Sequence, residues 1–281
     1  MKRKPSVAGQ FYPGGATELR AMIRGLIDPR ARKEKAIAVV SPHAGYVYSG
    51  PVAGAVFSSV VLPRTCVILG PAHREIAPVF AIQRSGSWTT PLGEVPVETD
   101  LADAIMKSAP LVKEDAGAHL HEHSLEVQVP FLQFFREDIA IVPVCVSYEA
   151  SYEDLAGLGK AVAEAIGGFG SDVLIVASTD MSHYISREAA EKKDNLAIDR
   201  VLALDAEGLF RTVVRENISM CGFQPVTAAL IAAKDLGALK AELIRYQTSG
   251  DVTGDYREVV GYAGIRITGS SDIIMGNGIK I

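Results

Sequence analysis

Cysteine is scarce in this sequence, and the residues that occur form no recognisable pattern. Cys66, Cys145 and Cys221 are widely spaced, and the 281 residues contain no CxxC pair. Three isolated cysteines argue against a disulfide framework and against a zinc ribbon. Cys66 and Cys145 lie inside apolar runs and are expected in the core. We therefore expect reduced thiols and a cytoplasmic protein.

Long apolar runs and an excess of basic charge are also absent. No run approaches the roughly 20 residues needed to span a bilayer. The basic start, Met1–Lys4, is followed by no apolar stretch of the kind found in signal peptides. The formal net charge is −5, from 33 acidic and 28 basic residues, whereas a nucleic-acid-binding protein needs a basic face. We expect neither a membrane nor a nucleic acid as partner.

The chain lacks internal repeats, low-complexity tracts and long linkers, which favours one domain over residues 1–281. Short apolar runs typical of doubly covered strands occur at Ala36–Val40, Thr65–Leu69, Ile139–Val146 and Val173–Ala177, and further strands are expected at Glu242–Gln247 and Val259–Ile267. Helices are expected at Thr17–Ile27 (N-cap Thr17), Pro51–Val60 (Pro51 in the first turn), Ser124–Phe135, Tyr152–Ile166, Val226–Leu236 and, as a pair, within Arg187–Val214. Ser270–Ile281 is expected as an edge segment or a loose end. The alternation predicts a layered α/β fold with a partly parallel sheet.

Three histidines each follow a predicted strand by a few residues. His43, His73 and His183 come after the first, second and fourth of the four apolar strands. In open α/β sheets ligands bind beyond the carboxyl ends of the strands, so these imidazoles should meet at one edge. A single loop histidine is more often a surface residue, and the strand–Pro–His context shared by His43 and His73 is what favours function. Asp180 either orients His183 or caps the next helix.

Cys221 precedes the helix that is predicted to begin near Val226. A thiol near a helix N-terminus is expected to have a lowered pKa and hence more thiolate, the form that binds metals. The alternative is that Cys221 only fills space in the core, as free cysteines commonly do. The residues alone leave both interpretations open.

The segment from His119 to His123 contains three alternating histidines. An extended segment would place all three imidazoles on one side. The spacing is not HExxH, so a zincin mechanism has no support. We expect His123 to belong to a site, and His119 and His121 to be solvated.

Motifs for nucleotide binding and for serine hydrolases are missing. The chain contains no GxxxxGK[ST], no GxGxxG after a strand and no GxSxG. Gly167–Gly170 is better interpreted as a turn that ends a helix. The chemistry is therefore to be sought among the histidines and Cys221.

Taken together, the motifs resemble those of the Memo family. The resemblance extends from about residue 4 to about residue 267, on Pro5–Pro13, Ser41–Tyr46, Gly70–His73, Glu122–Gln128, Ser178–His183 and Cys221–Gly222, in the family's order. Prokaryotic members are also called protein B of the AmmeMemoRadiSam system, after a recurrent gene grouping with a radical-SAM protein. The resemblance implies a fold like that of the class III extradiol dioxygenases, a three-layer αβα sandwich with a central mixed, partly parallel sheet.

The resemblance also implies roles for individual residues. The dioxygenases hold non-haem Fe(II) with two histidines and a glutamate, and use a further histidine as acid and base. By motif, His43 and His73 correspond to the histidine ligands, and Cys221 falls where the dioxygenases have the glutamate. His183, with Asp180 beside it, corresponds to the acid–base histidine, and His123 belongs to the same cleft. A thiolate in place of a carboxylate shifts the metal preference towards Cu(I) or zinc.

These observations lead to one main hypothesis and two alternatives. The main one is a metal-dependent redox or oxygen-handling protein in which His43, His73 and Cys221 bind iron, or else copper or zinc, and His183 moves protons. The first alternative is a non-catalytic module for anionic phosphopeptides or small molecules, with Arg74 pairing with the anion. The second is a zinc hydrolase. Each implies a small-molecule or peptide ligand, and the gene grouping implies a radical-SAM partner.

Overall fold

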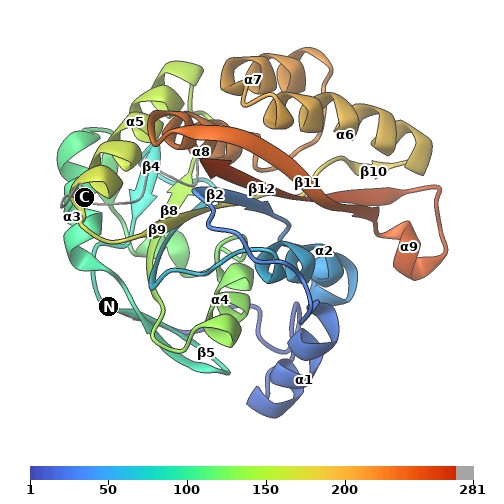
Figure 1. The fold of residues 1–281 in the computed structure, drawn as a ribbon, viewed down its shortest axis with the longest axis horizontal. Coiled ribbons are helices and arrows are strands. Elements are labelled where there is room, and N and C mark those ends of the chain that lie inside the picture. The colour runs from blue at the N-terminus through green and yellow to red at the C-terminus, as the bar shows by residue number, and fades with distance from the viewer. Residues whose placement is uncertain (270–281) are drawn as a thin grey trace, which may run out of the picture.

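The computed structural model describes residues 1–269, whose strands form one large sheet and one small sheet (Figure 1). The large sheet contains β2 (Ala38–Ser41), β3 (Thr65–Pro71), β4 (Phe80–Ile82), β7 (Val112–Glu114), β8 (Ala140–Val146), β9 (Val173–Ser178), β10 (His183–Ile185), β11 (Ala238–Thr248) and β12 (Val259–Gly269). Their order is β10-β12-β2-β9-β3-β8-β4-β7, with β11 also paired to β12. The small sheet joins β1 (Lys2–Arg3), β5 (Ser87–Thr90) and β6 (Gly93–Pro96).

The centre of the large sheet is parallel. β2, β9, β3 and β8 run in the same direction, and every residue in them is buried. Their apolar sequences do not alternate with polar residues, because both faces of these strands are covered. β12 lies antiparallel beside β2, and β4 lies antiparallel beside β8. The mixed, partly parallel sheet that was expected is therefore present.

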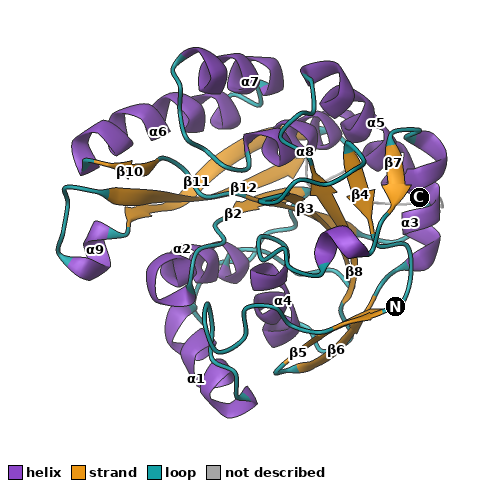
Figure 2. Ribbon diagram, turned by 180° about the vertical axis from the view of Figure 1, so that it is seen from behind, coloured by secondary structure: helices purple, strands orange, loops and turns teal. Residues whose placement is uncertain are grey.

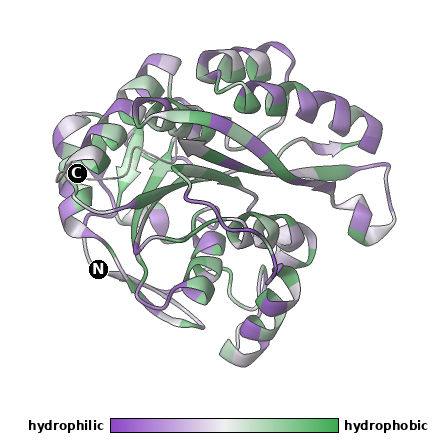
Figure 3. Ribbon diagram, viewed as in Figure 1, coloured by the Kyte–Doolittle hydropathy of each residue, from purple (hydrophilic) through white to green (hydrophobic). Residues whose placement is uncertain are grey.

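Helices cover both faces of this sheet (Figure 2). One face packs against α1 (Ala16–Leu26), α2 (Tyr46–Ser58) and α4 (Val129–Phe135). The other packs against α3 (Thr99–Ser108), α5 (Tyr152–Gly168), α6 (Arg187–Leu202), α7 (Ala206–Arg215) and α8 (Phe223–Asp235). A short helix, α9 (Gly250–Thr253), lies between β11 and β12. Apolar residues concentrate on the central strands (Figure 3). The buried apolar residues form two clusters, one on each side of the sheet.

Several helix starts differ from those predicted, and α8 begins at Phe223 and not near Val226. α1 is capped by Gly15 rather than by Thr17. α2 begins at Tyr46, so Pro51 lies inside the helix and not in its first turn. Proline cannot donate to the carbonyl four residues earlier, that of Val47, but Val47 is exposed and water can replace the missing donor.

The region between β3 and β8 departs most from the prediction. The helix expected over Ser124–Phe135 is a 3-10 helix, Glu126–Gln128, followed by α4. A second 3-10 helix occupies Gly117–His119. α3 and the short strands β4 to β7 were not predicted. Ser270–Ile281 lies outside the described residues, and no helix in residues 1–269 is long and apolar enough to cross a membrane.

Candidate metal centre

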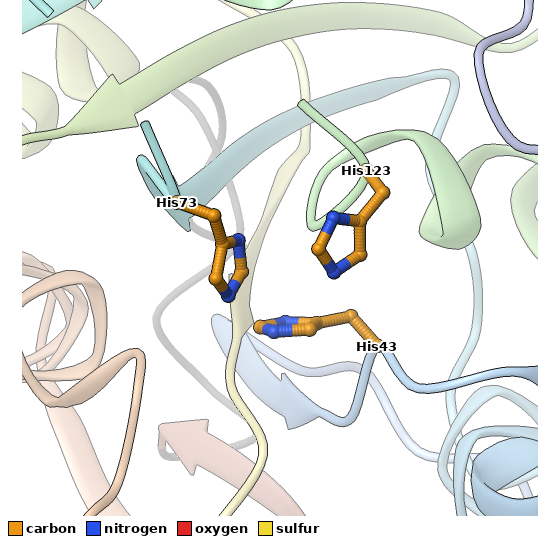
Figure 4. Close-up of side chains that lie close together, drawn as sticks. All are labelled: His43, His73 and His123. Atoms are coloured by element: carbon orange, nitrogen blue, oxygen red, sulfur yellow. The ribbon is translucent and has the colours of Figure 1, made fainter. Parts of the chain in front are cut away.

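The carboxyl ends of the parallel strands bring predicted site residues together. Ser41 at the end of β2 pairs with Ser178 at the end of β9, and β3 ends beside them. His43 and His73 therefore extend beyond the same edge of the sheet. His123 reaches this edge from the segment before α4, and the three imidazoles face one another (Figure 4).

The three imidazoles form a compact group. Each of His43, His73 and His123 offers a ring nitrogen within 4.8 Å of the other two. The rings of His73 and His123 stack with centroids 4.4 Å apart, and His43 meets both edge-on at 5.2 and 5.5 Å. The side chain of His43 is 2% exposed, whereas those of His73 and His123 are 29% and 22% exposed. The group is closed on the side of His43 and open to solvent on the other.

Ser178 determines which nitrogen of His43 carries the proton. The Ser178 hydroxyl donates to the Ser124 carbonyl at 2.6 Å, so its oxygen accepts from Nδ1–H of His43 at 2.9 Å. The side-chain amide of Gln128 donates to the same oxygen at 2.8 Å. Because Nδ1 holds the proton, Nε2 of His43 keeps a lone pair that is available to a metal ion.

Glu122 fixes His73 in the same way and was not identified from the sequence. Its carboxylate accepts from the backbone N–H of His73 at 2.7 Å, from His73 Nδ1 at 2.9 Å and from the N–H of Ser124 at 2.7 Å. Burial alone would raise the pKa of Glu122, but the hydrogen bonds from His73 and Ser124 lower it. The carboxylate can only accept, so His73 keeps a lone pair on Nε2. The sequence feature that could have identified Glu122 was its position directly before His123, because metal-binding imidazoles commonly donate to a carboxylate.

His123 is held differently from the other two. Its Nδ1 lies 3.7 Å from Glu122, too far for a hydrogen bond, and its side chain has no hydrogen-bond partner among the described residues. Instead its ring packs against His73 and against Phe11, whose ring centroid is 4.8 Å away. The position of His123 therefore depends on its backbone and on ring contacts.

The buried imidazoles are neutral. Burial lowers the pKa of His43 well below its ordinary value and lowers the pKa of His123 to about 4, and neighbouring imidazoles contribute to both shifts. Loss of hydration disfavours the charged ring. Neutral imidazole is the form that binds metal ions, so no proton has to leave these rings near neutral pH.

Cys221 lies beside His43. Its Sγ is 3.2 Å from Nε2 of His43 and accepts from the backbone N–H of Asp180 at 3.3 Å. The predicted lowering of its pKa is wrong, because burial raises the pKa of the Cys221 thiol and the Asp180 carboxylate raises it further. α8 begins two residues later, at Phe223, but the burial outweighs the helix dipole. A metal ion on this sulfur would have to displace the proton itself.

Asp180 and His183 do not form the pair that their spacing suggested. Asp180 accepts from the backbone N–H of His43 at 2.8 Å, and its other oxygen lies 4.0 Å from His43 Nε2. Burial raises the pKa of Asp180 to about 6. His183 donates from Nδ1 to the Ser219 carbonyl at 2.8 Å, which leaves Nε2 free to accept a proton. Ser186, not Asp180, caps α6.

The two remaining histidines lie apart from this group. His121 is exposed, as expected. His119 was expected to be solvated, but it is completely buried, with Nδ1 3.4 Å from the sulfur of Cys145. The segment bends through a 3-10 helix instead of extending, so the three histidines do not share one side. Cys145 and Cys66 are buried in strands, as predicted.

Comparison with known proteins identifies the family. A family profile described as Memo-like protein matches residues 3–266. The chain belongs to the Memo family. A MEMO1 family protein of Methanopyrus kandleri is 41% identical over 279 residues, covering 94% of this chain and 98% of the relative. One of Methanococcus maripaludis is 43% identical over 286 residues, covering 95% and 100%.

Among solved structures, an uncharacterized protein from Escherichia coli K12 has the same fold. The TM-score is 0.53 at 14% sequence identity, and the match covers 82% of this chain and 99% of that one. This likeness concerns the arrangement of sheet and helices. The α/β fold expected for the Memo family resemblance is thus present in the chain.

The residues of this Memo family protein fit a transition-metal ion. Three imidazoles converge, and two of them are held through Nδ1 by groups that leave Nε2 facing away from these partners. A thiol and a carboxyl group, from Cys221 and Asp180, lie beside His43. Imidazole suits iron, copper and zinc, whereas thiolate favours Cu(I) and zinc. The donor set therefore supports a metal site without selecting the metal.

Proposed function

We propose that this Memo family protein is a metal-dependent redox or oxygen-handling protein. The observation that carries the proposal is the convergence of nitrogens from His43, His73 and His123 within 4.8 Å of one another. Cys221 is a further donor next to His43. The ligand set implied by the family resemblance, His43, His73 and Cys221, shares two residues with this group, and His123 is the addition.

Iron or copper is proposed ahead of zinc. Iron follows from the resemblance to the class III dioxygenases, and copper from the soft sulfur of Cys221. Such an ion would supply Lewis acidity and one-electron chemistry to a bound substrate.

The surrounding residues support proton handling at this site. His183 donates from Nδ1 to the Ser219 carbonyl, which orients the ring and leaves Nε2 as the nitrogen that can exchange a proton. Asp180, whose pKa is raised to about 6 by burial, can change its protonation near neutral pH. Because His73 and His123 form the solvent-exposed side of the group, a small-molecule or peptide ligand would approach from there.

Metal binding is tested by loading anaerobically purified protein with Fe(II), Cu(I) or Zn(II) and measuring content and affinity. Wild type should hold stoichiometric metal, and His43→Ala and His73→Ala should lose it. His121→Ala is the matched control, because this exposed histidine belongs to the same segment as His123 but not to the group. Oxygen consumption by the loaded protein then tests the redox role.

The outcomes separate the alternatives. Stoichiometric iron or copper together with oxygen consumption supports the proposal. Stoichiometric zinc alone would favour a hydrolase in which metal-bound water is the nucleophile. No metal under any condition would overturn the proposal and favour binding of anionic ligands, for which Arg74, exposed beside His73, is the first residue to substitute.

A further inference from the structure

The N-terminal segment Arg3–Tyr12 contacts the candidate metal centre, although the proposed function gives it no role. Arg3 pairs through β1 with β5, and its side chain is completely buried, with the guanidinium 4.2 Å from the ring of Trp88. A fully buried arginine is rare unless its charge is paired. The partners of Arg3 therefore indicate what this segment does.

All three principal partners of Arg3 belong to the segment 119–126. Nε donates to the carbonyl of His119 at 2.6 Å, Nη2 donates to the carbonyl of Glu122 at 2.8 Å, and Nη2 lies 2.7 Å from the carboxylate of Glu126. The rigid fork of a guanidinium fixes several acceptors in one plane. One side chain thus holds the beginning, middle and end of the segment that carries His123.

Glu126 connects this segment back to the N-terminus. Its buried carboxylate accepts from the backbone N–H of Ser6 at 2.7 Å, from that of Val7 at 3.0 Å and from the hydroxyl of Tyr12 at 2.6 Å. Together with Arg3, these contacts satisfy the charge of Glu126 without solvent. The first twelve residues and the segment 119–126 therefore form one hydrogen-bonded unit.

The same N-terminal segment contacts the ring of His123 and the loop that carries His43. The ring of Phe11 packs against His123 at 4.8 Å between centroids. The carbonyl of Phe11 accepts from the N–H of Tyr46 at 2.8 Å, at the start of α2 and three residues after His43. The segment thus spans from the support of His123 to the loop that carries His43.

We infer that Arg3–Tyr12 is an N-terminal clamp that completes the metal centre, with Arg3 and Glu126 as positioning residues. They hold the segment 119–126 so that Glu122 and His123 meet His73. His43 is held directly by the hydrogen bond from its Nδ1 to Ser178, and only indirectly by the clamp, because Ser178 donates to Ser124. His123 has no side-chain hydrogen bond among the described residues and therefore depends most on the clamp. The metal-affinity part of the inference rests on the proposed function.

The test compares Arg3→Met, Arg3→Lys and Glu126→Gln with wild type. The control is Arg266→Met, because Arg266 is also a buried arginine, 6% exposed, and bonds to Glu242 and to Ser59 beyond the far end of α2. Two properties are measured: affinity for whichever of Fe(II), Cu(I) or Zn(II) wild type binds, and the ring NMR signals of the histidines in metal-free protein.

Arg3→Met and Glu126→Gln should each weaken metal binding at least about tenfold, as loss of a supporting partner does. They should move the ring signals of His123 more than those of His43, which has its own hydrogen bond to Ser178. Arg3→Lys should recover part of both properties, because it keeps the charge but not the fork. Arg266→Met should change neither property, even where it lowers the melting temperature as much.

Unchanged affinity and unchanged His123 signals in folded Arg3→Met would overturn the clamp. If Arg3→Met does not fold, Arg3→Lys and Glu126→Gln are judged by the same criteria. If wild type binds none of the metals, the proposed function fails, but the His123 signals of the metal-free variants still decide whether the clamp positions that ring.

Discussion

Two regions of this molecule each bring a histidine nitrogen close to a cysteine sulfur. At the carboxyl edge of the sheet, Nε2 of His43 lies 3.2 Å from Cys221. In the core, Nδ1 of His119 lies 3.4 Å from Cys145. Both imidazoles are almost completely shielded from water, and burial lowers the pKa of both.

The surroundings of the two pairs differ. His43 is hydrogen-bonded by Ser178 on one nitrogen, and His73 and His123 each bring a ring nitrogen within 4.8 Å of a nitrogen of His43. His119 instead lies edge-on to Trp88 at 5.7 Å between centroids, completely buried and outside the three-histidine group. A contact between histidine and cysteine is therefore no sign of a metal site by itself. Several donors that point to one place, each held from behind, are the distinguishing feature.

The largest expected difference between the regions is in metal binding. His73→Ala removes a ligand and should lower affinity more than about 100-fold, beyond the loss caused by a supporting partner. His119→Gln should leave affinity unchanged. Competition with a chelator of known affinity measures both. An equal loss in the two variants would mean that the core pair belongs to the site.

The second prediction concerns the acid sensitivity that burial gives to the core pair. Burial, with a contribution from the charge of Arg3, lowers the pKa of His119 to about 4 in the folded protein. In the unfolded chain a histidine titrates near 6.5. Between these values the unfolded state binds more protons, so stability rises with pH there and is lost as pH falls from about 6.5 towards 4. His119 should account for about 2 to 3 kcal/mol of that loss.

Urea unfolding of metal-free protein between pH 7.5 and 4.5 tests this contribution. The stability of His119→Gln should decrease less steeply on acidification than that of wild type, whatever its stability at pH 7.5. His121→Gln, at an exposed position, should follow the wild-type slope. Parallel curves for wild type and His119→Gln would show that His119 contributes nothing to the loss of stability in acid.

The sequence predicted the part of the site that depends on strand ends. β2, β3 and β9 are short apolar runs, and the residues that follow parallel strands meet at one edge, so His43 and His73 were placed correctly near each other. His183 was expected with them, but the third imidazole of the group is that of His123. The long helices were also predicted, because their apolar periodicity and capping residues can be recognised within one short stretch of sequence. Strands of three or four residues such as β4 have too few positions to show a period.

What could not be predicted depends on the path of one loop and on burial. The 3-10 helix that ends at His119 turns this imidazole into the core and leaves His123 at the site, whereas the alternation of the histidines had suggested a common side. Glu122 acquires its role only because this turn brings its carboxylate to His73, far away in sequence. The pKa of Cys221 is raised and not lowered as expected, because the position of a residue near a helix start does not show how deeply it is buried.

The third prediction concerns the group that supports His73. Glu122→Gln removes the negative charge and places an amide NH₂ group, itself a donor, next to the N–H groups of His73 and Ser124 that donate to the carboxylate. It should therefore weaken metal binding by about 10- to 100-fold. Glu75→Gln, an exposed change near His73, should have no such effect. Affinities of the two variants, measured with the metal that wild type binds, decide the matter. Equal affinity in both would mean that His73 is oriented without Glu122.

The smallest expected effect is the loss of the core thiol. Cys145→Ala removes one buried sulfur from a strand whose neighbours are all packed, which should cost about 1 kcal/mol of unfolding free energy. Metal affinity should stay the same, because Cys145 faces His119 and not the three-histidine group.

The matched substitution at the site is Cys221→Ala. It should lower the affinity for Cu(I) more than the affinity for Fe(II), because only the soft ion depends strongly on sulfur. If both alanine variants lowered metal affinity to the same degree, the difference between a core pair and a site pair would not hold, and the two cysteines would have to act through a common structural effect on the sheet between them.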